Sequence, residues 1–199
     1  GSRGMVGAVS LAANAALRGG AGLVTFAAPA PVQLTVATLC PCATSLPLDC
    51  DEAGGLAPSS ARQVARAAAA ADVLAVGPGM GTGPGPAGLV RAALQQDKPL
   101  VLDADGLNNL AALDGWPRWR RCPIVLTPHP GEFSRLTGRG VAEVQADRRG
   151  AALAAARLWA GAGAAAPVVC LLKGAGTVVT DGERLYVNRT GNPGMRSEE

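Results

Sequence analysis

Aromatic residues are scarce in this chain, and long charged or apolar runs are missing. Phe, Trp and Tyr make up 3% of the 199 residues, which leaves few rings for stacking on nucleic-acid bases. The net charge is +3 without a long basic run, so we expect no nucleic-acid partner. Every apolar stretch is interrupted by Gly, Pro or charge before it reaches the length of a membrane span, so we expect no membrane partner either.

Metal-ligating side chains are also sparse. The five cysteines show no zinc-ligand spacing and His129 is the only histidine, so a zinc site is not expected. Cys122 and Cys170 fall in or beside apolar runs and are expected to be small buried hydrophobes. An odd cysteine count without a secretory signal pattern favours a reducing, cytoplasmic compartment.

Hydrophobic residues, by contrast, make up 48% of the chain, and 27 glycines are dispersed among them. Apolar runs alternate with helix-forming segments, which predicts an α/β fold with a mostly parallel central sheet and helices on both faces. Strands are expected at residues 22–27, 72–76, 99–102, 124–126, 168–172, 178–180 and 184–188. Helices are expected at residues 8–18, 61–71, 86–95, 106–113, 132–136 and 141–161. The segment 29–48 is ambiguous and fits a short helix followed by an edge strand, and Asp181-Gly182 is expected to form a hairpin turn.

Four of the expected strands end in residues that are unusual for simple loops. These endings are residues 77–79, 103–105, 127–132 and 173–177. In open α/β sheets, ligands bind beyond the carboxyl ends of the strands. We therefore expect one binding site where the four endings converge.

Lys173 and the glycines at residues 77–81 each allow two interpretations. Lys173 is one of two lysines against sixteen arginines, and a compact ammonium at a strand end suits a contact with a phosphate or a carboxylate. The alternative is a solvated side chain. The glycines form either a plain strand-to-helix turn or a wall against which a flat ligand lies.

The acidic residues at the strand ends also leave alternatives. Asp105 is expected to cap the helix that starts at Gly106, whereas Asp103 stays open between metal binding and acid–base chemistry. The three-residue spacing of His129 and Glu132 by itself favours a helix start. The functional alternative gives Glu132 an indirect role at magnesium and His129 a hydrogen bond to the substrate.

In their order along the chain, these segments resemble the NAD(P)H-hydrate dehydratase family, relatives of ribokinase. The matching stretches are Gly1-Ser2 with Gly7-Ala8, residues 17–24, 77–81, 102–108, 126–133 and 172–178, and Asn188 with residues 190–195. The resemblance implies a ribokinase-like fold and an enzyme that uses ADP or ATP to phosphorylate the hydroxyl group of hydrated NADH or NADPH. Loss of the phosphate then restores the nicotinamide ring.

The resemblance also implies roles for individual residues. The AMP part of the nucleotide would be lined by Lys173, Gly174, Ala175, Gly176 and Thr177. The hydrated substrate would meet Ala8, Gly79, Gly81 and His129. Glu132 would act indirectly at Mg²⁺. His129 replaces an Asn of the ribokinase relatives, and the His-Pro-Gly-Glu form at residues 129–132 favours ADP over ATP.

The chain departs from the family pattern at both ends. Family members have a strand ahead of Gly1, and after Met195 they continue with a Gly-Gly-x-Gly-Asp segment and further helices. The catalytic Asp is therefore expected beyond Glu199, and no catalytic residue is expected within residues 1–199. We expect a single ribokinase-like domain fragment that is incomplete at both ends. Two alternatives stay open, namely a ribokinase-like kinase of a small molecule such as a vitamin precursor, and a non-catalytic nucleotide-binding remnant. A homo-oligomer also stays open.

Overall fold

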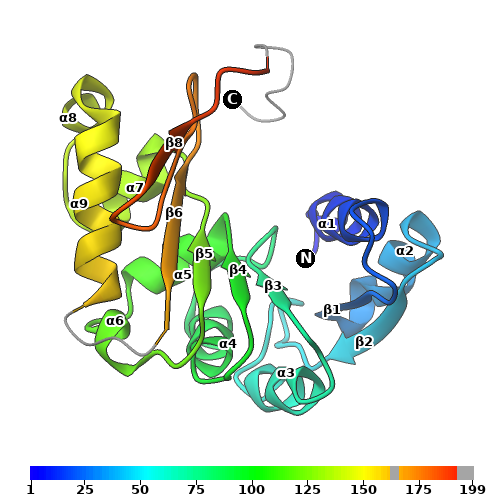
Figure 1. The fold of residues 1–199 in the computed structure, drawn as a ribbon. Coiled ribbons are helices and arrows are strands. Elements are labelled where there is room, and N and C mark those ends of the chain that lie inside the picture. The colour runs from blue at the N-terminus through cyan, green and yellow to red at the C-terminus, as the bar shows by residue number, and fades with distance from the viewer. Residues whose placement is uncertain (162–165, 192–199) are drawn as a thin grey trace.

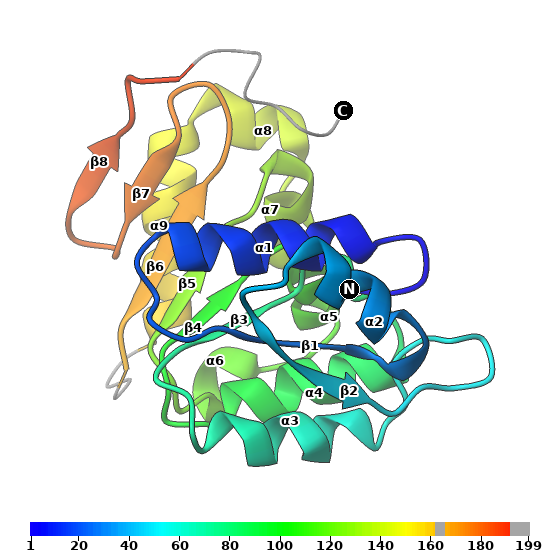
Figure 2. The same ribbon diagram turned by 90° about the vertical axis from the view of Figure 1, so that its right-hand side faces the viewer.

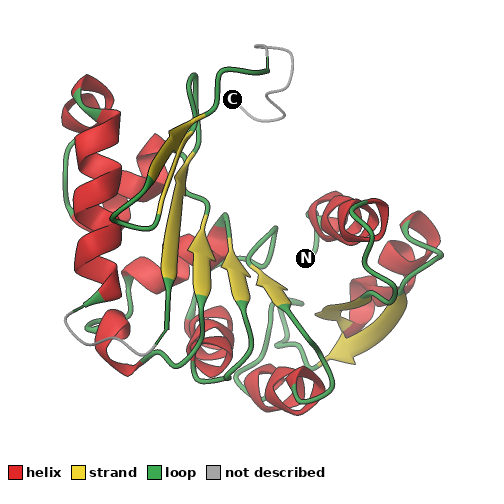
Figure 3. Cartoon of the chain, in the orientation of Figure 1, coloured by secondary structure: helices red, strands yellow, loops and turns green. Residues whose placement is uncertain are grey.

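The computed structural model describes residues 1–161 and 166–191, in which helices and strands alternate along the chain (Figures 1 and 3). The helices are α1 (Val6–Arg18), α2 (Ala30–Leu39), α3 (Ser60–Ala68), α4 (Pro84–Leu94), α5 (Asp105–Ala111), α6 (Trp116–Trp119), α7 (Pro130–Thr137), α8 (Val141–Ala146) and α9 (Arg148–Ala160). The strands are β1 (Thr25–Pro29), β2 (Thr44–Leu48), β3 (Leu74–Val76), β4 (Leu100–Leu102), β5 (Ile124–Leu126), β6 (Val168–Leu172), β7 (Val178–Thr180) and β8 (Leu185–Val187). None of these helices has the length and apolar character needed to cross a membrane.

The central sheet contains the strands β3 to β8 in the order of the chain. Neighbours from β3 to β6 run parallel, whereas β6, β7 and β8 are joined as antiparallel neighbours. Within the described residues, β1 and β2 pair parallel to each other in a separate small sheet. The α/β class and the mostly parallel central sheet are therefore confirmed.

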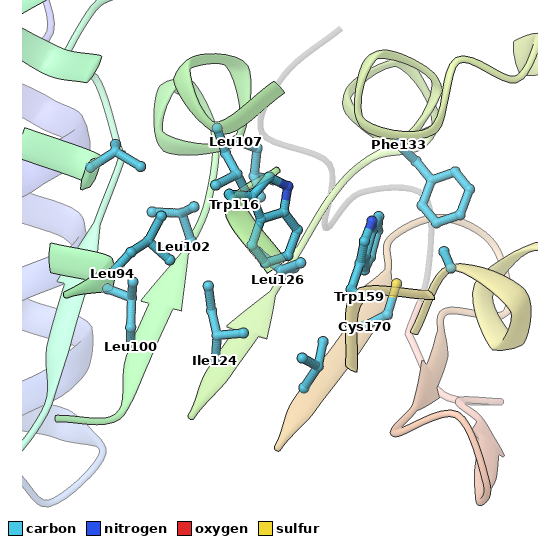
Figure 4. Packing of buried hydrophobic residues seen from close by; sticks show 14 of the residues in the cluster. Leu94, Leu100, Leu102, Leu107, Trp116, Ile124, Leu126, Phe133, Trp159 and Cys170 are labelled. Carbon is cyan, nitrogen blue, oxygen red and sulfur yellow. The ribbon is translucent and has the colours of Figure 1, made fainter. Parts of the chain in front are cut away.

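Helices α4, α5, α7 and α9 cover one face of the central sheet (Figure 1). Right-handed crossovers between parallel strands that follow one another in chain order place their helices on the same face. In this layer Leu102, Leu126 and Cys170 are fully buried in one cluster with Phe133 of α7 and Trp159 of α9 (Figure 4). The rings of Phe133 and Trp159 meet edge to face at 5.9 Å, a favoured aromatic geometry.

The other face of the sheet carries a row of valines. Val101, Val125 and Val169 are cross-strand neighbours on β4, β5 and β6, and each is half-buried. Alternation of a fully buried and a half-buried set follows from the two-residue period of a strand. The continuous apolar runs in the sequence thus reflect two faces of different exposure.

Helices α1 and α2 and the small sheet form a separate layer beside β3 (Figures 1 and 2). Their own core contains Phe26, Val36 and Cys40, while Leu48 of β2 joins the core of the central sheet. The ambiguous segment 29–48 therefore forms a helix followed by a strand, as one interpretation expected. The strand expected at 22–27 begins three residues later, at Thr25.

One helical prediction was wrong, and one helix was not predicted. The single helix expected at 141–161 is divided at Asp147, whose side chain accepts a hydrogen bond from the N–H of Gly150 at 2.9 Å and caps the start of α9. Asp is a preferred N-cap residue, so it begins a new helix here. The short helix α6 was not expected. It follows Gly115, which has a left-handed conformation (φ 64°), and it has a proline in its first turn.

The hairpin turn between β7 and β8 is longer than expected, because it includes residues 181–184. The Asp181 carboxylate accepts backbone hydrogen bonds from Arg184 and Glu183 and pairs with the Arg184 side chain. The bonds from Arg184, followed by the one from Glu183, lower the pKa of Asp181 to about 2. Cys122 and Cys170 are fully buried, as expected, and burial raises the pKa of the Cys170 thiol to about 12.

Candidate functional site at the carboxyl ends of the strands

The carboxyl ends of β3, β4, β5 and β6 lie at the same edge of the sheet, because these strands are parallel neighbours (Figure 1). The segments beyond them are joined by backbone hydrogen bonds. Asp103, Thr127 and Lys173 each donate their N–H to a carbonyl of the neighbouring strand or strand end, at 3.1, 3.2 and 2.8 Å. The four segments named from the sequence therefore form one continuous rim.

The backbone of Gly77, just after β3, lies directly against the backbone of Asp103, just after β4. Its φ is 130°, and a Cβ at this position would lie 1.7 Å from the backbone oxygen of Asp103. Only glycine fits both this backbone conformation and this distance. The glycine-rich segment after β3 is therefore more than a simple turn, since its first residue sets the spacing of two rim segments.

Gly79 and Ala8 are brought together, although 71 positions separate them in the sequence. A Cβ on Gly79 would lie 2.8 Å from Cβ of Met5 and 3.0 Å from Cβ of Ala8, at the start of α1. Gly81, with φ 78°, has open space where a Cβ would stand. Two of the expected substrate-binding residues thus touch, and a third belongs to the same loop.

Two polar side chains of α5 hold this loop in place. Asp105 Oδ2 accepts the N–H of Gly81 at 2.9 Å. The Asn109 side-chain amide donates to the Gly81 carbonyl at 2.9 Å and accepts the N–H of Gly83 at 3.3 Å. Asn109 is buried, and sequence reasoning missed it. A buried position for its polar side chain in the run Leu107-Asn108-Asn109-Leu110 is the signal that could have identified it.

The expectation that Asp105 caps the following helix was wrong. α5 begins at Asp105 itself, and its N-cap is Ala104, which makes no side-chain cap. Ala104 has φ 50° and ψ −124°, and it is the only non-glycine residue with positive φ in the described ranges. This backbone conformation is costly for alanine. It directs Asp103 and Asp105 to different partners, since Asp105 bonds to Gly81 and Asp103 to Lys173.

Lys173 forms the charged centre of the rim. Its Nζ donates to Asp103 Oδ1 at 2.7 Å and lies 3.9 Å from Glu132 Oε2. The Lys173 and Asp103 side chains are 39% and 34% exposed, whereas that of Glu132 is 5% exposed. The interpretation of Lys173 as a freely solvated side chain is therefore wrong, because the ammonium joins three of the rim segments.

His129 and Glu132 form a helix start, as their spacing favoured. His129 Nδ1 accepts the N–H groups of Gly131 and Glu132 at 3.0 and 3.4 Å, and Glu132 Oε2 accepts the N–H of His129 at 2.8 Å. This reciprocal arrangement is a capping box. The His129 side chain is half exposed. Among the described residues no hydrogen bond links it to Ala8, Gly79 or Gly81.

The loop after Lys173 presents backbone donors to solvent. Gly174 and Gly176 have φ of 139° and 64°, and the Thr177 hydroxyl donates to the Gly174 carbonyl at 3.0 Å. Residues 174–176 are exposed. In the described part of the chain, no hydrogen bond uses the N–H of Gly174, Ala175 or Gly176. Successive free N–H groups in a turn are suited to bind an anion such as a phosphate.

A second residue that the sequence did not reveal lies behind this loop. Arg148, near the start of α9, donates to the carbonyls of Leu172 and Lys173 at 3.0 and 3.1 Å. An arginine in the first turn of a helix gives no sequence signal of such a contact. The loop at residues 174–176 is therefore preceded by the cation Lys173 and adjoins a second cation, Arg148.

Comparison with known proteins shows which family the chain belongs to. The family model described as NAD(P)H-hydrate dehydratase matches residues 1–198. The bifunctional NAD(P)H-hydrate repair enzyme Nnr of Moorella thermoacetica is 43% identical over 198 residues, which cover 98% of this chain and 36% of that protein. The chain thus spans about a third of the length of this curated relative.

Solved structures agree with this match. The ADP/ATP-dependent NAD(P)H-hydrate dehydratase of Bacillus subtilis, crystallised with ATP/Mg²⁺ and soaked with CoA, superposes with a TM-score of 0.76 at 31% identity, covering 96% of this chain and 64% of that one. A ribokinase-like superfamily protein of Enterococcus faecalis, with a TM-score of 0.73 at 22% identity over 97% of this chain and 62% of that one, supports the fold alone. The match of the family model to residues 1–198 establishes that the chain belongs to the NAD(P)H-hydrate dehydratase family.

Proposed function

We propose that this chain binds an adenine nucleotide and hydrated NADH or NADPH at the rim, and supports the ADP- or ATP-dependent dehydration of the hydrate. The observation that carries the proposal is the loop at residues 174–176, whose exposed N–H groups have no protein acceptor in the described residues. This loop follows β6, and the chain belongs to the NAD(P)H-hydrate dehydratase family. A relative of this family was crystallised with ATP/Mg²⁺.

The nucleotide would bind along residues 173–177. The free N–H groups of the loop suit phosphate oxygens, and the Lys173 ammonium supplies a point charge at its start. Because Asp103 already holds this ammonium at 2.7 Å, a bound phosphate would share Lys173 with the carboxylate. Gly174 and Gly176 keep this segment free of bulky side chains, so that a ligand can approach the backbone.

The hydrate would bind beside the nucleotide, against Ala8, Gly79 and Gly81 and next to His129. Ala8 and Gly79 lie against each other. Gly79 is buried, whereas Ala8 and Gly81 are half-buried, so Ala8 and Gly81 would make most of the contact with a flat nicotinamide ring. The His129 ring is half exposed and its Nδ1 is used by the helix cap. Its Nε2 lies 3.5 Å from Glu132 Oε1, so a hydroxyl or amide group of the substrate would share this nitrogen with the Glu132 carboxylate.

The chemistry follows from the leaving group. Hydroxide leaves a carbon atom poorly, whereas phosphate leaves readily, and the lone pair of the ring nitrogen assists its departure. Transfer of the terminal phosphoryl group of ADP or ATP to the hydroxyl oxygen of the hydrate breaks the phosphoanhydride bond, releases AMP or ADP, and leaves the hydroxyl proton to solvent. The carbon–oxygen bond then breaks with phosphate as the leaving group, and loss of a proton from the neighbouring ring carbon restores the double bond. In this proposal the chain's residues hold the two reactants in position, an effect that contributes much of an enzymatic rate.

Mg²⁺ enters the proposal only together with the nucleotide. The described residues contain no group of three or more His, Cys, Asp or Glu side chains that could hold a metal ion. Glu132 is 5% exposed, and its carboxylate is engaged by the backbone of His129 and by Lys173. The protein residues described here therefore do not form a magnesium site by themselves, and we assign Glu132 an indirect role through Lys173.

The experiment that tests the proposal is a turnover assay with three arms. Because the catalytic Asp is expected beyond Glu199, the chain is first completed at both ends with the corresponding segments of a relative, including its Gly-Gly-x-Gly-Asp sequence. Hydrated NADH is incubated with this completed protein and ADP, with this protein and ATP, and with this protein alone, and the return of reduced nicotinamide absorbance is followed. We expect nucleotide-dependent recovery, faster with ADP than with ATP. No recovery with either nucleotide would contradict the proposal. In a parallel incubation with ATP and a vitamin alcohol in place of the hydrate, phosphorylation of the alcohol without recovery of NADH in the other arms would instead identify a small-molecule kinase.

A further inference from the structure

We propose that Arg148 is a positioning residue that fixes the start of the nucleotide loop at residues 174–176. This role rests on the proposed nucleotide site and extends it to a side chain on a different element. Arg148 makes no contact with the expected ligand in this inference. It acts through the backbone of β6 and of Lys173.

The contacts of Arg148 converge on the point where β6 ends. Its Nη2 donates to the carbonyl oxygens of Leu172 and Lys173, at 3.0 and 3.1 Å. Its Nη1 donates to Oε1 of Gln145 on α8 at 3.0 Å. One guanidinium thus holds two successive carbonyls, which a flexible lysine ammonium could not match with the same fixed geometry.

Gly174 lies directly against this guanidinium. A Cβ on Gly174 would stand 3.0 Å from Nη2 and 3.1 Å from Nη1 of Arg148, and the φ of Gly174 is 139°. The backbone conformation therefore favours glycine, and a larger residue would also have to displace the guanidinium. The loop turns away from β6 on the surface that Arg148 provides, so the position of the guanidinium fixes the direction in which residues 174–176 leave the strand.

The charge of Arg148 is not neutralised by a carboxylate. No ion pair includes it among the described residues, and its buried Nε has no hydrogen-bond partner there. Burial lowers the pKa of Arg148, but an arginine stays charged at any physiological pH. A partly desolvated cation held only by neutral groups is costly, and an anionic ligand on the adjacent loop would offset that cost.

Arg157 on the same helix provides a matched control. Its Nε donates to the carbonyl of Gly182 at 2.6 Å, and the backbone and side chain of Arg157 lie against Gly182. Arg157 therefore holds the β7–β8 turn in the way that Arg148 holds the loop after β6. Removing either arginine takes a guanidinium-to-carbonyl contact from α9, but only Arg148 adjoins the proposed nucleotide site.

The positioning role is tested first without any ligand. Hydrogen–deuterium exchange is measured for wild-type protein, Arg148→Gln and Arg157→Gln. The reporter amides are those that make hydrogen bonds, namely the N–H of Lys173, bonded to the Pro128 carbonyl at 2.8 Å, and the N–H groups of residues 182–184. We expect Arg148→Gln to speed exchange at Lys173 about tenfold and to leave residues 182–184 unchanged, and Arg157→Gln to do the reverse. This size corresponds to losing one hydrogen bond to a charged group. Equal exchange at Lys173 in wild type and Arg148→Gln would overturn the inference.

The link to the nucleotide is tested by calorimetric titration with ADP. We expect Arg148→Gln to weaken ADP affinity about tenfold or more, Arg148→Lys to lie between it and wild type, and Arg157→Gln to match wild type. Unchanged affinity in Arg148→Gln, while wild type binds ADP, would overturn the role at the nucleotide. An equal loss in Arg157→Gln would show general destabilisation and would also overturn it. If wild type binds no ADP, the proposed function fails, and the nucleotide part of this inference fails with it.

Discussion

Replacing Lys173 with methionine separates the contribution of this residue to ADP affinity from its contribution to the stability of the fold. The substitution keeps the aliphatic stem and removes the ammonium that lies 2.7 Å from Asp103 and 3.9 Å from Glu132. Lys173 and Asp103 are both more than a third exposed, so water screens their attraction. Exposed ion pairs contribute about 0–1 kcal/mol to stability. We therefore expect the free energy of unfolding to fall by about 1 kcal/mol.

The expected effect on nucleotide binding is larger. A hydrogen bond to a charged group contributes roughly 1.5–3 kcal/mol, which corresponds to about a tenfold to hundredfold loss of ADP affinity. Calorimetric titration gives the affinity, and urea unfolding gives the stability of the same preparations. The control is Lys98→Met, because Lys98 lies between α4 and β4 at the opposite end of the strands. Unchanged ADP affinity in Lys173→Met, or an equal loss in Lys98→Met, would refute the assignment.

Three further predictions concern the rim. Gly77→Ala should lower the free energy of unfolding by about 3 kcal/mol or more, because its Cβ would stand 1.7 Å from the Asp103 oxygen. Gly81→Ala serves as the control and should cost only about 1 kcal/mol, because a Cβ there meets open space. Equal losses of the two variants in urea unfolding would contradict this. Ala104→Gly should raise the stability by about 1 kcal/mol by relieving positive φ, and a lower stability would show that the backbone is unstrained. His129→Asn should keep the helix cap, so the free energy of unfolding should change by less than about 0.5 kcal/mol. The same variant should raise KM for the hydrate and leave KM for ADP unchanged. The opposite KM pattern would show that His129 does not contact the substrate.

Much of the fold follows from local sequence signals. The short apolar runs at β4, β5 and β6 are bounded by residues that cannot continue a strand, so their positions were predicted closely. The parallel arrangement then places the ends of these strands at one rim, so a candidate site at this rim could be predicted from the sequence alone. Boundaries such as Asp147 depend on a choice between continuing and capping a helix, and periodicity does not decide that choice.

The contacts within the site were less accessible to sequence reasoning. Lys173 and Asp103 are 70 positions apart, and the side-chain directions that bring them together depend on the unusual backbone at Ala104. That conformation also turns Asp105 from a helix cap into a partner of Gly81. Arg148 acts through backbone carbonyls, which every residue possesses. Such contacts leave no pattern in the sequence.

The measurement that tests the central claim most directly is a titration with ADP followed by NMR of the backbone amides. The account places the nucleotide phosphates on the N–H groups of Gly174, Ala175 and Gly176, which have no acceptor within residues 1–161 and 166–191. These three resonances should therefore shift most, and together with that of Lys173 they should saturate at one common affinity. Shifts that gather instead at the amino ends of the strands, with residues 173–177 unaffected, would contradict the account.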